Sequence, residues 1–445
     1  MSQQKNTLGV GMAFMATIFF IFGFVTTFNI TLSAKVKEVF QLSEFMAQLV
    51  NGVFFFTYFL LSFVCGTIIK KIGYKMGVIM GLFMVGIGSF LFFPAANIPS
   101  YPFFLVAIFI MASGVVFLQT AANPYVAVLG APETSSGRLN LVQALNSIGT
   151  TIAPLLLSVF VFTSAASAMG AKAVQVPFLI IGTLVILIGI GIFFLRLPEI
   201  STQGGEKKKS VWKYPHVILG AVGIFCYVGA EVGTAAMIVP YLTAPHLGGL
   251  TTAIAAKYAA IYWGGAMIGR FFGSIMLSKI SDNTKKYTYV ALVLLFAFIA
   301  GWYITGYSTN DGLIFLGISA VNFLAMLLGR SRTSITLAVF AVIAAILELV
   351  TMGSSGMVAL WAVISIGFFN SVMFPNIFAL SVDGLDNSEM SMASGIINTL
   401  IVGGAVVPVL MGVITDNVGV RWAFILPVFC YAYITFFALV GSKKR

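Results

Sequence analysis

The sequence predicts an all-α integral membrane protein with two bundles of six membrane-spanning helices and one helical hairpin inserted into the second bundle. Apolar stretches of about 20 residues recur along the chain, and each is long enough to cross the roughly 30 Å core of a bilayer. A basic segment at 204–210 (GGEKKKS) interrupts them near the middle of the chain. Hydrophobic residues make up 60% of the chain and charged residues 8%. Soluble domains carry about 25% charged residues, so most of this surface must face lipid.

The hydrophobic pattern divides the chain into fourteen predicted spans, two more than a plain six-plus-six arrangement. The first bundle, 1–197, holds spans at 8–33, 46–69, 76–96, 103–129, 139–163 and 175–197. A cytoplasmic linker follows at 198–215, and the second bundle occupies 216–445. Its spans lie at 216–243, 252–280, 287–306, 312–330, 333–352, 356–381, 391–414 and 420–441. We assign the extra pair to a hairpin at 287–330. The stretch from Leu8 lacks a small-residue cleavage site, so we expect a retained first span.

The basic residues are distributed unevenly between the two sides of the membrane. With the N-terminus placed inside, eighteen of the 24 lysines and arginines fall on cytoplasmic segments, five fall outside, and Arg270 lies within a span. Short loops of membrane proteins show this asymmetry because positive residues stay in the cytoplasm. An odd number of spans would place the basic C-terminus, 443–445, outside. We therefore expect both termini to be cytoplasmic, and the net charge of +11 gives no reason to expect nucleic-acid binding.

The cysteines point to neither a disulfide framework nor a metal cluster. The chain has three of them, and all lie inside apolar spans: Cys65, Cys226 and Cys430. An odd, buried set of this kind lacks the spacing of a disulfide scaffold or of a zinc site. We therefore expect no metal site, no disulfide framework and no enzyme activity.

Two of the thirteen acidic residues fall inside predicted spans. Glu348 lies a few residues before Met352, where its span ends, so we expect it to reach the headgroup region. Glu231 lies near the middle of its span, where a charge costs roughly 2.5–3.5 kcal/mol to insert. Glu231 must therefore face a cavity or a partner, which makes it the candidate for coupling to an ion. The alternative is a neutral carboxyl that only bonds a neighbouring helix.

Uncharged amides are the second polar signal within the spans. Gln119 and Asn123 are four residues apart and share one helix face, and Asn140, Gln143 and Asn146 form another polar stripe. Amides recur in other spans, at Asn29, Asn51, Asn370, Asn376 and Asn398. Any single amide can instead join two helices, a contact worth about 0.6 kcal/mol on average. So many amides together favour a polar pocket.

The chemistry of this pocket suits a neutral polyhydroxylated solute, because an amide donates and accepts hydrogen bonds without charge. The rings of Tyr227, Tyr262 and Trp263 can cover the apolar face of a sugar or simply pack helices. An anionic solute would require a basic side chain at mid-depth, and the candidate, Arg270, lies towards the cytoplasmic end. The proposed substrate-binding residues are Gln119, Asn123, Gln143, Asn146, Glu231 and Asn370.

Several longer segments resemble one known family. They are 119–126 (QTAANPYV), 138–147 (RLNLVQALNS), 227–232 (YVGAEV), 369–378 (FNSVMFPNIF) and 401–408 (IVGGAVVP). These segments are similar to the fucose:proton symporter family of the major facilitator superfamily, and closest to its glucose/galactose-type members. The resemblance implies the major facilitator fold, import of a hexose driven by an ion gradient, and a place in a bacterial inner membrane. It also implies that Gln143 and Asn146 line the sugar cavity.

The chain departs from this family at two carboxylates. The family's first span usually carries Asn-Asp-Ile-Leu, whereas this chain has Asn29 followed by Ile30. Fucose-type members have a glutamate in the fourth span where this chain has Gln119. Three outcomes stay open: Glu231 takes over the coupling role, sodium replaces the proton, or coupling is lost.

We therefore predict a secondary active transporter that imports a neutral hexose or related sugar by alternating access between two rocking bundles. Its expected coupling ion is a proton or sodium, and no other cofactor is expected. Its expected partners are the sugar and the lipid bilayer, and we expect it to act as a monomer. The alternatives are a proton-driven exporter of cationic drugs that pair with Glu231, an uncoupled sugar facilitator, and a sensor that binds sugar without moving it.

Overall fold

The structure is a computed structural model that describes residues 2–128, 135–163, 165, 168–195, 213–245, 249–277, 282–329, 332–385, 393 and 395–443. Within these residues the chain is almost entirely helical, and no strand occurs. The predicted all-α class is therefore confirmed. Most of the predicted linker lies outside the described residues, since only 213–215 of it are described.

The N-terminal helices follow the predicted spans closely. They are α1 (Ser2–Phe40), α2 (Glu44–Asn97), α3 (Tyr101–Val128), α4 (Ser135–Phe160), the short 3₁₀ helix η2 (Gly170–Val174) and α6 (Gln175–Phe194). Helix α2 covers two predicted spans, because the chain turns at Gly73 without a gap between them. Gly73 has φ +82°, a conformation that glycine adopts without a steric penalty because it lacks a Cβ.

The C-terminal helices also match the prediction in order. They are α7 (Pro215–Thr243), α8 (Thr252–Leu277), α9 (Asn283–Ile304), α10 (Thr309–Leu328), α11 (Thr333–Gly353), α12 (Gly356–Asn370), α13 (Met373–Val382), η4 (Leu400–Val402), α15 (Gly403–Val418), α16 (Val420–Ala423), α17 (Ile425–Phe436) and the π-helical turn η5 (Phe437–Gly441). Thirteen segments of the described chain are long and apolar enough to cross a membrane. Helix α8 is not among them, but it packs against α4, α7 and α12 and occupies the place of the fourteenth predicted span.

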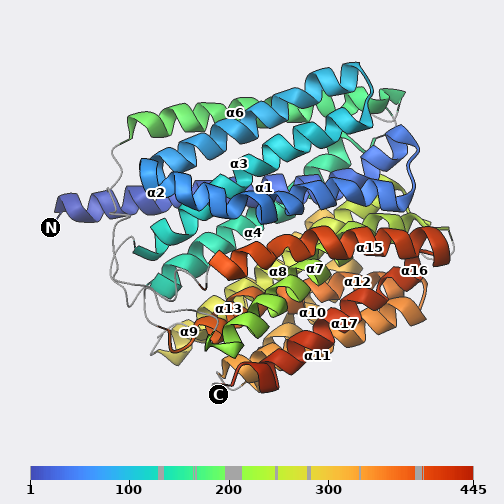
Figure 1. The fold of residues 1–445 in the computed structure, drawn as a ribbon. Coiled ribbons are helices and arrows are strands. Elements are labelled where there is room, and N and C mark those ends of the chain that lie inside the picture. The colour runs from blue at the N-terminus through green and yellow to red at the C-terminus, as the bar shows by residue number, and fades with distance from the viewer. Residues whose placement is uncertain are drawn as a thin grey trace.

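The helices form two groups that meet along a central seam. Figure 1 shows α1–α6, in blue to green, on one side, and α7–α17, in yellow-green to red, on the other. The most extensive contacts between the groups are made by α2 with α15 and by α4 with α8, and α1 also contacts α7. Both chain ends lie at the same end of the helices, as an even number of crossings requires. The polar residues of interest lie along this seam and on the helices directly behind it.

Helices α9 and α10 form an antiparallel pair at the edge of the C-terminal group. Ser308 caps α10, because its hydroxyl accepts a hydrogen bond from the Asp311 backbone N–H at 3.3 Å. Only 17% of the α9 span is buried within the protein, compared with 89% for α7. Asn322 of α10 donates from Nδ2 to the Phe368 carbonyl of α12 at 2.9 Å, which fixes the pair to the bundle. Most of the surface of α9 is therefore left for lipid.

Candidate functional site

Glu231 lies on α7 at a point where that helix packs closely against α15. The neighbouring Gly229 and Gly233 make this approach possible, because a Cβ at Gly229 would lie 2.4 Å from Val407 and one at Gly233 would lie 2.6 Å from Met411. The Glu231 side chain is 11% exposed, so the carboxyl is almost removed from water. A carboxyl in such a position requires a partner.

The partner of Glu231 is Arg270 of α8, whose Nη2 lies 3.9 Å from Glu231 Oε1. Arg270 also donates from Nη1 to the Ser147 hydroxyl of α4 at 2.5 Å and from Nε to the Ser371 carbonyl at 3.3 Å. The arginine therefore connects the C-terminal helices to the N-terminal helices across the seam. Arg270 lies in the second half of α8, and from there its guanidinium comes within 3.9 Å of the central carboxyl.

A chain of hydrogen bonds continues from Glu231 into the C-terminal group. The Tyr262 hydroxyl donates to the Glu231 backbone carbonyl at 3.0 Å, and Asn370 Nδ2 donates to the Tyr262 hydroxyl at 2.8 Å. The Tyr431 hydroxyl donates to Asn370 Oδ1 at 2.8 Å. These bonds join α7, α8, α12 and α17. Both ends of the fully buried Asn370 amide are occupied in this state, so a ligand must displace a tyrosine to reach it.

The predicted amides of the N-terminal group lie on α3 and α4. Asn146 is 6% exposed, and its Nδ2 donates to the Phe19 carbonyl of α1 at 2.9 Å. Gly23 of α1 leaves room for this amide, because a Cβ there would lie 2.4 Å from Asn146 Nδ2. Gln119 and Gln143 are half-buried, and their side-chain amides make no hydrogen bond to the described residues. Asn123 lies in α3, but its side chain is outside the part of the chain that is described.

Asn29 of α1 is a polar residue that the predicted site omitted. Its side chain is fully buried, and within the described residues neither Oδ1 nor Nδ2 has a hydrogen-bond partner. The buried hydroxyl of Thr27, two residues earlier, also has no hydrogen-bond partner among the described residues. Buried amides are nearly always satisfied, so this pair indicates a place that water or a hydroxylated ligand fills. The sequence signal was its position beside Ile30, where the related family carries an acid.

Glu348 does not lie where the sequence suggested. We expected it to reach the headgroup region, but its side chain is fully buried. The Thr234 hydroxyl of α7 donates to Glu348 Oε1 at 2.6 Å. The end of α11 is covered by other chain segments, among them Arg421, which donates to the Ser354 carbonyl at 2.9 Å. A position near a helix end is therefore not a surface position here.

The two helix groups are joined tightly at the end that the charge distribution predicts to be outside. Asp416 of α15 accepts hydrogen bonds from the backbone N–H groups of Glu44 and Phe45, at 2.7 and 2.8 Å. These are the first residues of α2, where unpaired N–H groups and the helix dipole favour an anion. Glu44 is itself paired with Lys37 at 2.6 Å. Gly412 permits the contact, since a Cβ there would lie 2.8 Å from Phe45 Cα.

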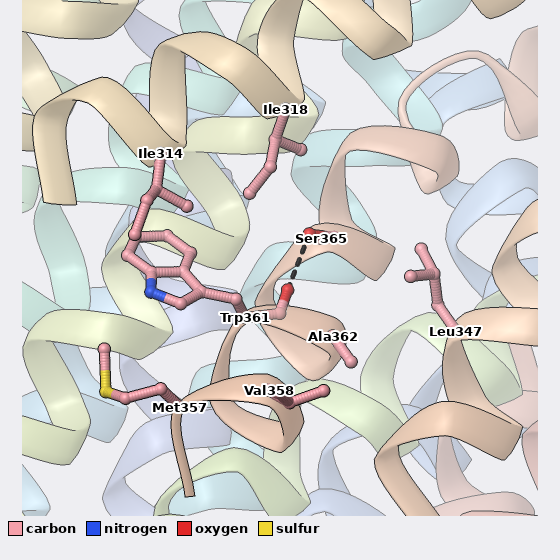
Figure 2. Close-up of a pocket in the computed structure, with 8 residues that line it drawn as sticks. All are labelled: Ile314, Ile318, Leu347, Met357, Val358, Trp361, Ala362 and Ser365. Atoms are coloured by element: carbon pink, nitrogen blue, oxygen red, sulfur yellow. Dashed lines mark hydrogen bonds between the residues drawn. The ribbon is translucent and has the colours of Figure 1, made fainter. Parts of the chain in front are cut away.

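A cavity of about 430 Å³ lies away from this seam, between α10, α11 and α12. Figure 2 shows its lining, which consists of Ile314, Ile318, Leu347, Met357, Val358, Trp361, Ala362 and Ser365. The lining is apolar apart from the indole N–H of Trp361 and the Ser365 hydroxyl, which donates to the Trp361 carbonyl at 2.6 Å. The cavity has too few polar groups for a sugar, so the polar seam is the better candidate site.

Comparison with known proteins agrees with this arrangement. The model of the Major Facilitator Superfamily matches residues 14–329. The chain is 38% identical over 452 residues to the glucose/galactose transporter of Brucella abortus biovar 1 (strain 9-941), covering 100% of this chain and 96% of the relative. It is 28% identical over 468 residues to the L-fucose-proton symporter of Escherichia coli (strain K12), covering 99% and 95%.

A solved structure gives the same answer for the fold. The chain superposes on the crystal structure of the transporter FucP in the outward conformation with a TM-score of 0.67 at 28% identity, covering 98% of this chain and all of that one. The predicted facilitator fold and the predicted family are confirmed. This chain belongs to the Major Facilitator Superfamily, whose members are transporters and not enzymes.

Proposed function

We propose that this protein imports a neutral hexose or a related sugar by alternating access, coupled to the entry of protons. The observation that carries the proposal is the Glu231–Arg270 ion pair, which contacts Ser147 across the seam between the two helix groups. It lies among amide side chains suited to sugar hydroxyls. The names of the relatives, a glucose/galactose transporter and an L-fucose-proton symporter, support a sugar as substrate and a proton as the coupling ion.

The proposed sugar site is the polar wall along the seam. Its members are Gln119, Asn123, Gln143, Asn146, Glu231 and Asn370, with Asn29 added by its unpaired amide. Amides that lack partners among the described residues bind hydroxyls when the seam admits a ligand. The hydrogen bonds of Asn146 to Phe19 and of Asn370 to its two tyrosines are exchanged for bonds to the sugar.

Glu231 is the proposed coupling residue. Adding a proton to this carboxyl removes its attraction for Arg270 and frees the guanidinium that contacts the opposite helix group. Proton binding thereby changes how firmly the two groups hold each other. Moving one positive charge inward with each sugar contributes about 2.3 kcal/mol per 100 mV, which sustains a roughly fiftyfold sugar gradient.

The proposal includes the topology and location of the protein. We place it in a bacterial inner membrane as a monomer with both termini in the cytoplasm. The first bundle is 1–197, the linker is 198–215, and the second bundle is 216–445. The hairpin 287–330, which corresponds to α9 and α10, is an insertion in the second bundle with a mostly lipid-facing surface.

An uncoupled sugar facilitator is the second candidate function. The observation that favours it is the absence of acids at Ile30 and Gln119, the positions where the related family carries carboxylates. Such a protein would equilibrate sugar across the membrane without concentrating it.

The test is uptake of radiolabelled glucose, galactose and L-fucose into proteoliposomes under an inward proton gradient, an inward sodium gradient, or neither. Proton-driven accumulation of one of these sugars supports the proposal. Accumulation under the sodium gradient alone would identify sodium as the coupling ion. Equilibration without accumulation would favour the uncoupled facilitator. Absence of sugar movement, combined with proton-driven efflux of a lipophilic cation, would refute sugar import.

A further inference from the structure

Glu348 is a second buried carboxyl, and the transport scheme proposed for Glu231 leaves it unused. It lies on α11, behind α7 as seen from the seam, and its side chain is 0% exposed. Oε1 lies 2.6 Å from the Thr234 hydroxyl of α7. Oε2 is buried and has no hydrogen-bond partner among the described residues.

The surroundings of Glu348 hold no counter-charge. In the described part of the chain, no lysine, arginine or histidine lies within 4.0 Å of either of its oxygens, whereas Glu231 has Arg270 within that distance. An ionised carboxylate buried without a counter-ion is strongly destabilising. In a carboxylic acid at the same place, Oε1 as the carbonyl oxygen keeps the hydrogen bond from the Thr234 hydroxyl, and only a neutral O–H at Oε2 lacks a partner.

The helices packed against α11 carry few other charged or titratable groups. Helices α12 and α13 and the turn η5 have none in their sequences. Helix α17 carries Cys430, Tyr431 and Tyr433. On α7, Glu231 is paired with Arg270, and the Tyr241 hydroxyl donates to the Thr351 carbonyl of α11. Arg421 of α16 and Asp311 of α10 have other partners, the Ser354 carbonyl and the Tyr258 hydroxyl. These neighbours are neutral groups or charges already engaged elsewhere.

We propose that Glu348 is a proton-binding site whose occupancy controls how closely α7 packs on α11. The inference rests on the proposed function, because it assigns a second proton site to the same transporter. The proton comes from water, adds to one carboxylate oxygen to form the acid, and returns to water when the site opens; no other bond changes. In the arrangement described here, the acid form suits a carboxyl that has no exposed surface and no counter-ion.

The position of Thr234 connects this site to the seam. Thr234 follows Glu231 by three residues, so the side chain that bonds Glu348 and the Glu231 carboxyl leave neighbouring positions of the same turn of α7. On the seam side, Gly229 and Gly233 hold α7 against α15, and α15 packs on α2 of the N-terminal group. Ionised Glu348 must recruit water, which separates α11 from α7 and favours a state in which the seam packing is looser.

The test compares the Glu348→Gln variant with wild type and with Asp282→Asn, which neutralises an exposed carboxyl and keeps a side chain that can cap α9. We expect Glu348→Gln to retain exchange of labelled against unlabelled sugar and to lose accumulation driven by a proton gradient. Asp282→Asn should behave as wild type in both assays. If Glu348→Gln showed wild-type exchange and unchanged accumulation, Glu348 would not be a proton site needed for transport. The proposal that the protein imports sugar would not be affected.

Infrared difference spectroscopy across a pH titration of the purified protein tests the site directly. The carbonyl-stretch band of a protonated carboxyl should be lost in Glu348→Gln and shifted in Thr234→Val, which removes the hydroxyl and keeps the shape. A band that persists unchanged in Glu348→Gln contradicts the proposal. The infrared band can be measured without any transport. If the wild-type protein moved no sugar, the proposed function would be refuted, and the band would still test whether Glu348 binds a proton.

Discussion

The N-terminal and C-terminal helix groups hold their central polar residues in different ways. On the N-terminal side, Asn29 has an unpaired amide, and the half-buried Gln143 side chain has no hydrogen bond among the described residues. On the C-terminal side, the Tyr262 hydroxyl and both ends of the Asn370 amide are hydrogen-bonded, and Glu231 has its arginine, while Glu231 Oε1 and the Tyr227 hydroxyl have no hydrogen bond among the described residues. The difference indicates that Asn29 and Gln143 offer neutral amides to a ligand, whereas the C-terminal side uses its amide to join helices and keeps its free polar atoms beside the charge.

Arg270→Met should have the largest effect, because it leaves Glu231 buried without its counter-charge. Removing one partner of a buried ion pair costs about 3–5 kcal/mol. Thermal unfolding in detergent should therefore show a large loss of stability. The double variant Glu231→Gln/Arg270→Met should regain most of that loss, since no lone charge remains. A double variant as unstable as the single one would show that the arginine stabilises the fold through its other contacts.

Glu231→Gln should abolish gradient-driven accumulation while leaving sugar exchange measurable. The expected loss is the roughly fiftyfold gradient that one co-transported charge sustains at 100 mV. Proteoliposome uptake with an imposed potential measures it, and Asp282→Asn serves as the control for an exposed carboxyl. Wild-type accumulation in Glu231→Gln would remove this residue from the coupling role.

Gln143→Ala should weaken sugar binding without destabilising the protein, because this amide makes no bond to the described residues that folding would lose. Loss of one hydrogen bond to a ligand corresponds to about 0.5–1.5 kcal/mol, or up to roughly tenfold in KM. Initial rates of uptake over a range of sugar concentrations measure it. A fall in melting temperature with unchanged KM would show that Gln143 stabilises the fold and does not bind the sugar.

Tyr431→Phe should have the smallest effect. It should lower stability without raising KM, which is the reverse of the result expected for Gln143→Ala. The variant deletes the hydroxyl that donates to Asn370 and so should cost about 1 kcal/mol of stability. The freed Asn370 carbonyl keeps its capacity to bind a sugar, so KM should not rise. An increased KM with unchanged thermal stability would show that the tyrosine itself contacts the ligand.

The helices could be predicted from the sequence because bilayer thickness fixes the length of the apolar stretches. The span at 216–243 corresponds to α7 (Pro215–Thr243) within a residue at its start. Gly73 shows a limit of the pattern, since two predicted spans form one continuous element across it.

The contacts between helices could not be predicted in the same way. The depth of Glu231 indicated that it needs a partner, but spacing along α8 does not reveal how far an arginine side chain reaches across to α7. Glu348 was placed near the surface because its helix ends close by, whereas segments distant in sequence cover that end. Such pairings depend on which helix faces meet, and a single hydrophobic pattern carries little of that information.

Proton movement during downhill sugar entry tests the central claim most directly. Sugar is added outside weakly buffered proteoliposomes that start without any ion gradient, and the external pH is recorded together with labelled uptake. The account predicts that the medium becomes alkaline in proportion to the sugar that enters, and that this change disappears in Glu231→Gln. Sugar entry into wild-type vesicles without a change in external pH would contradict it.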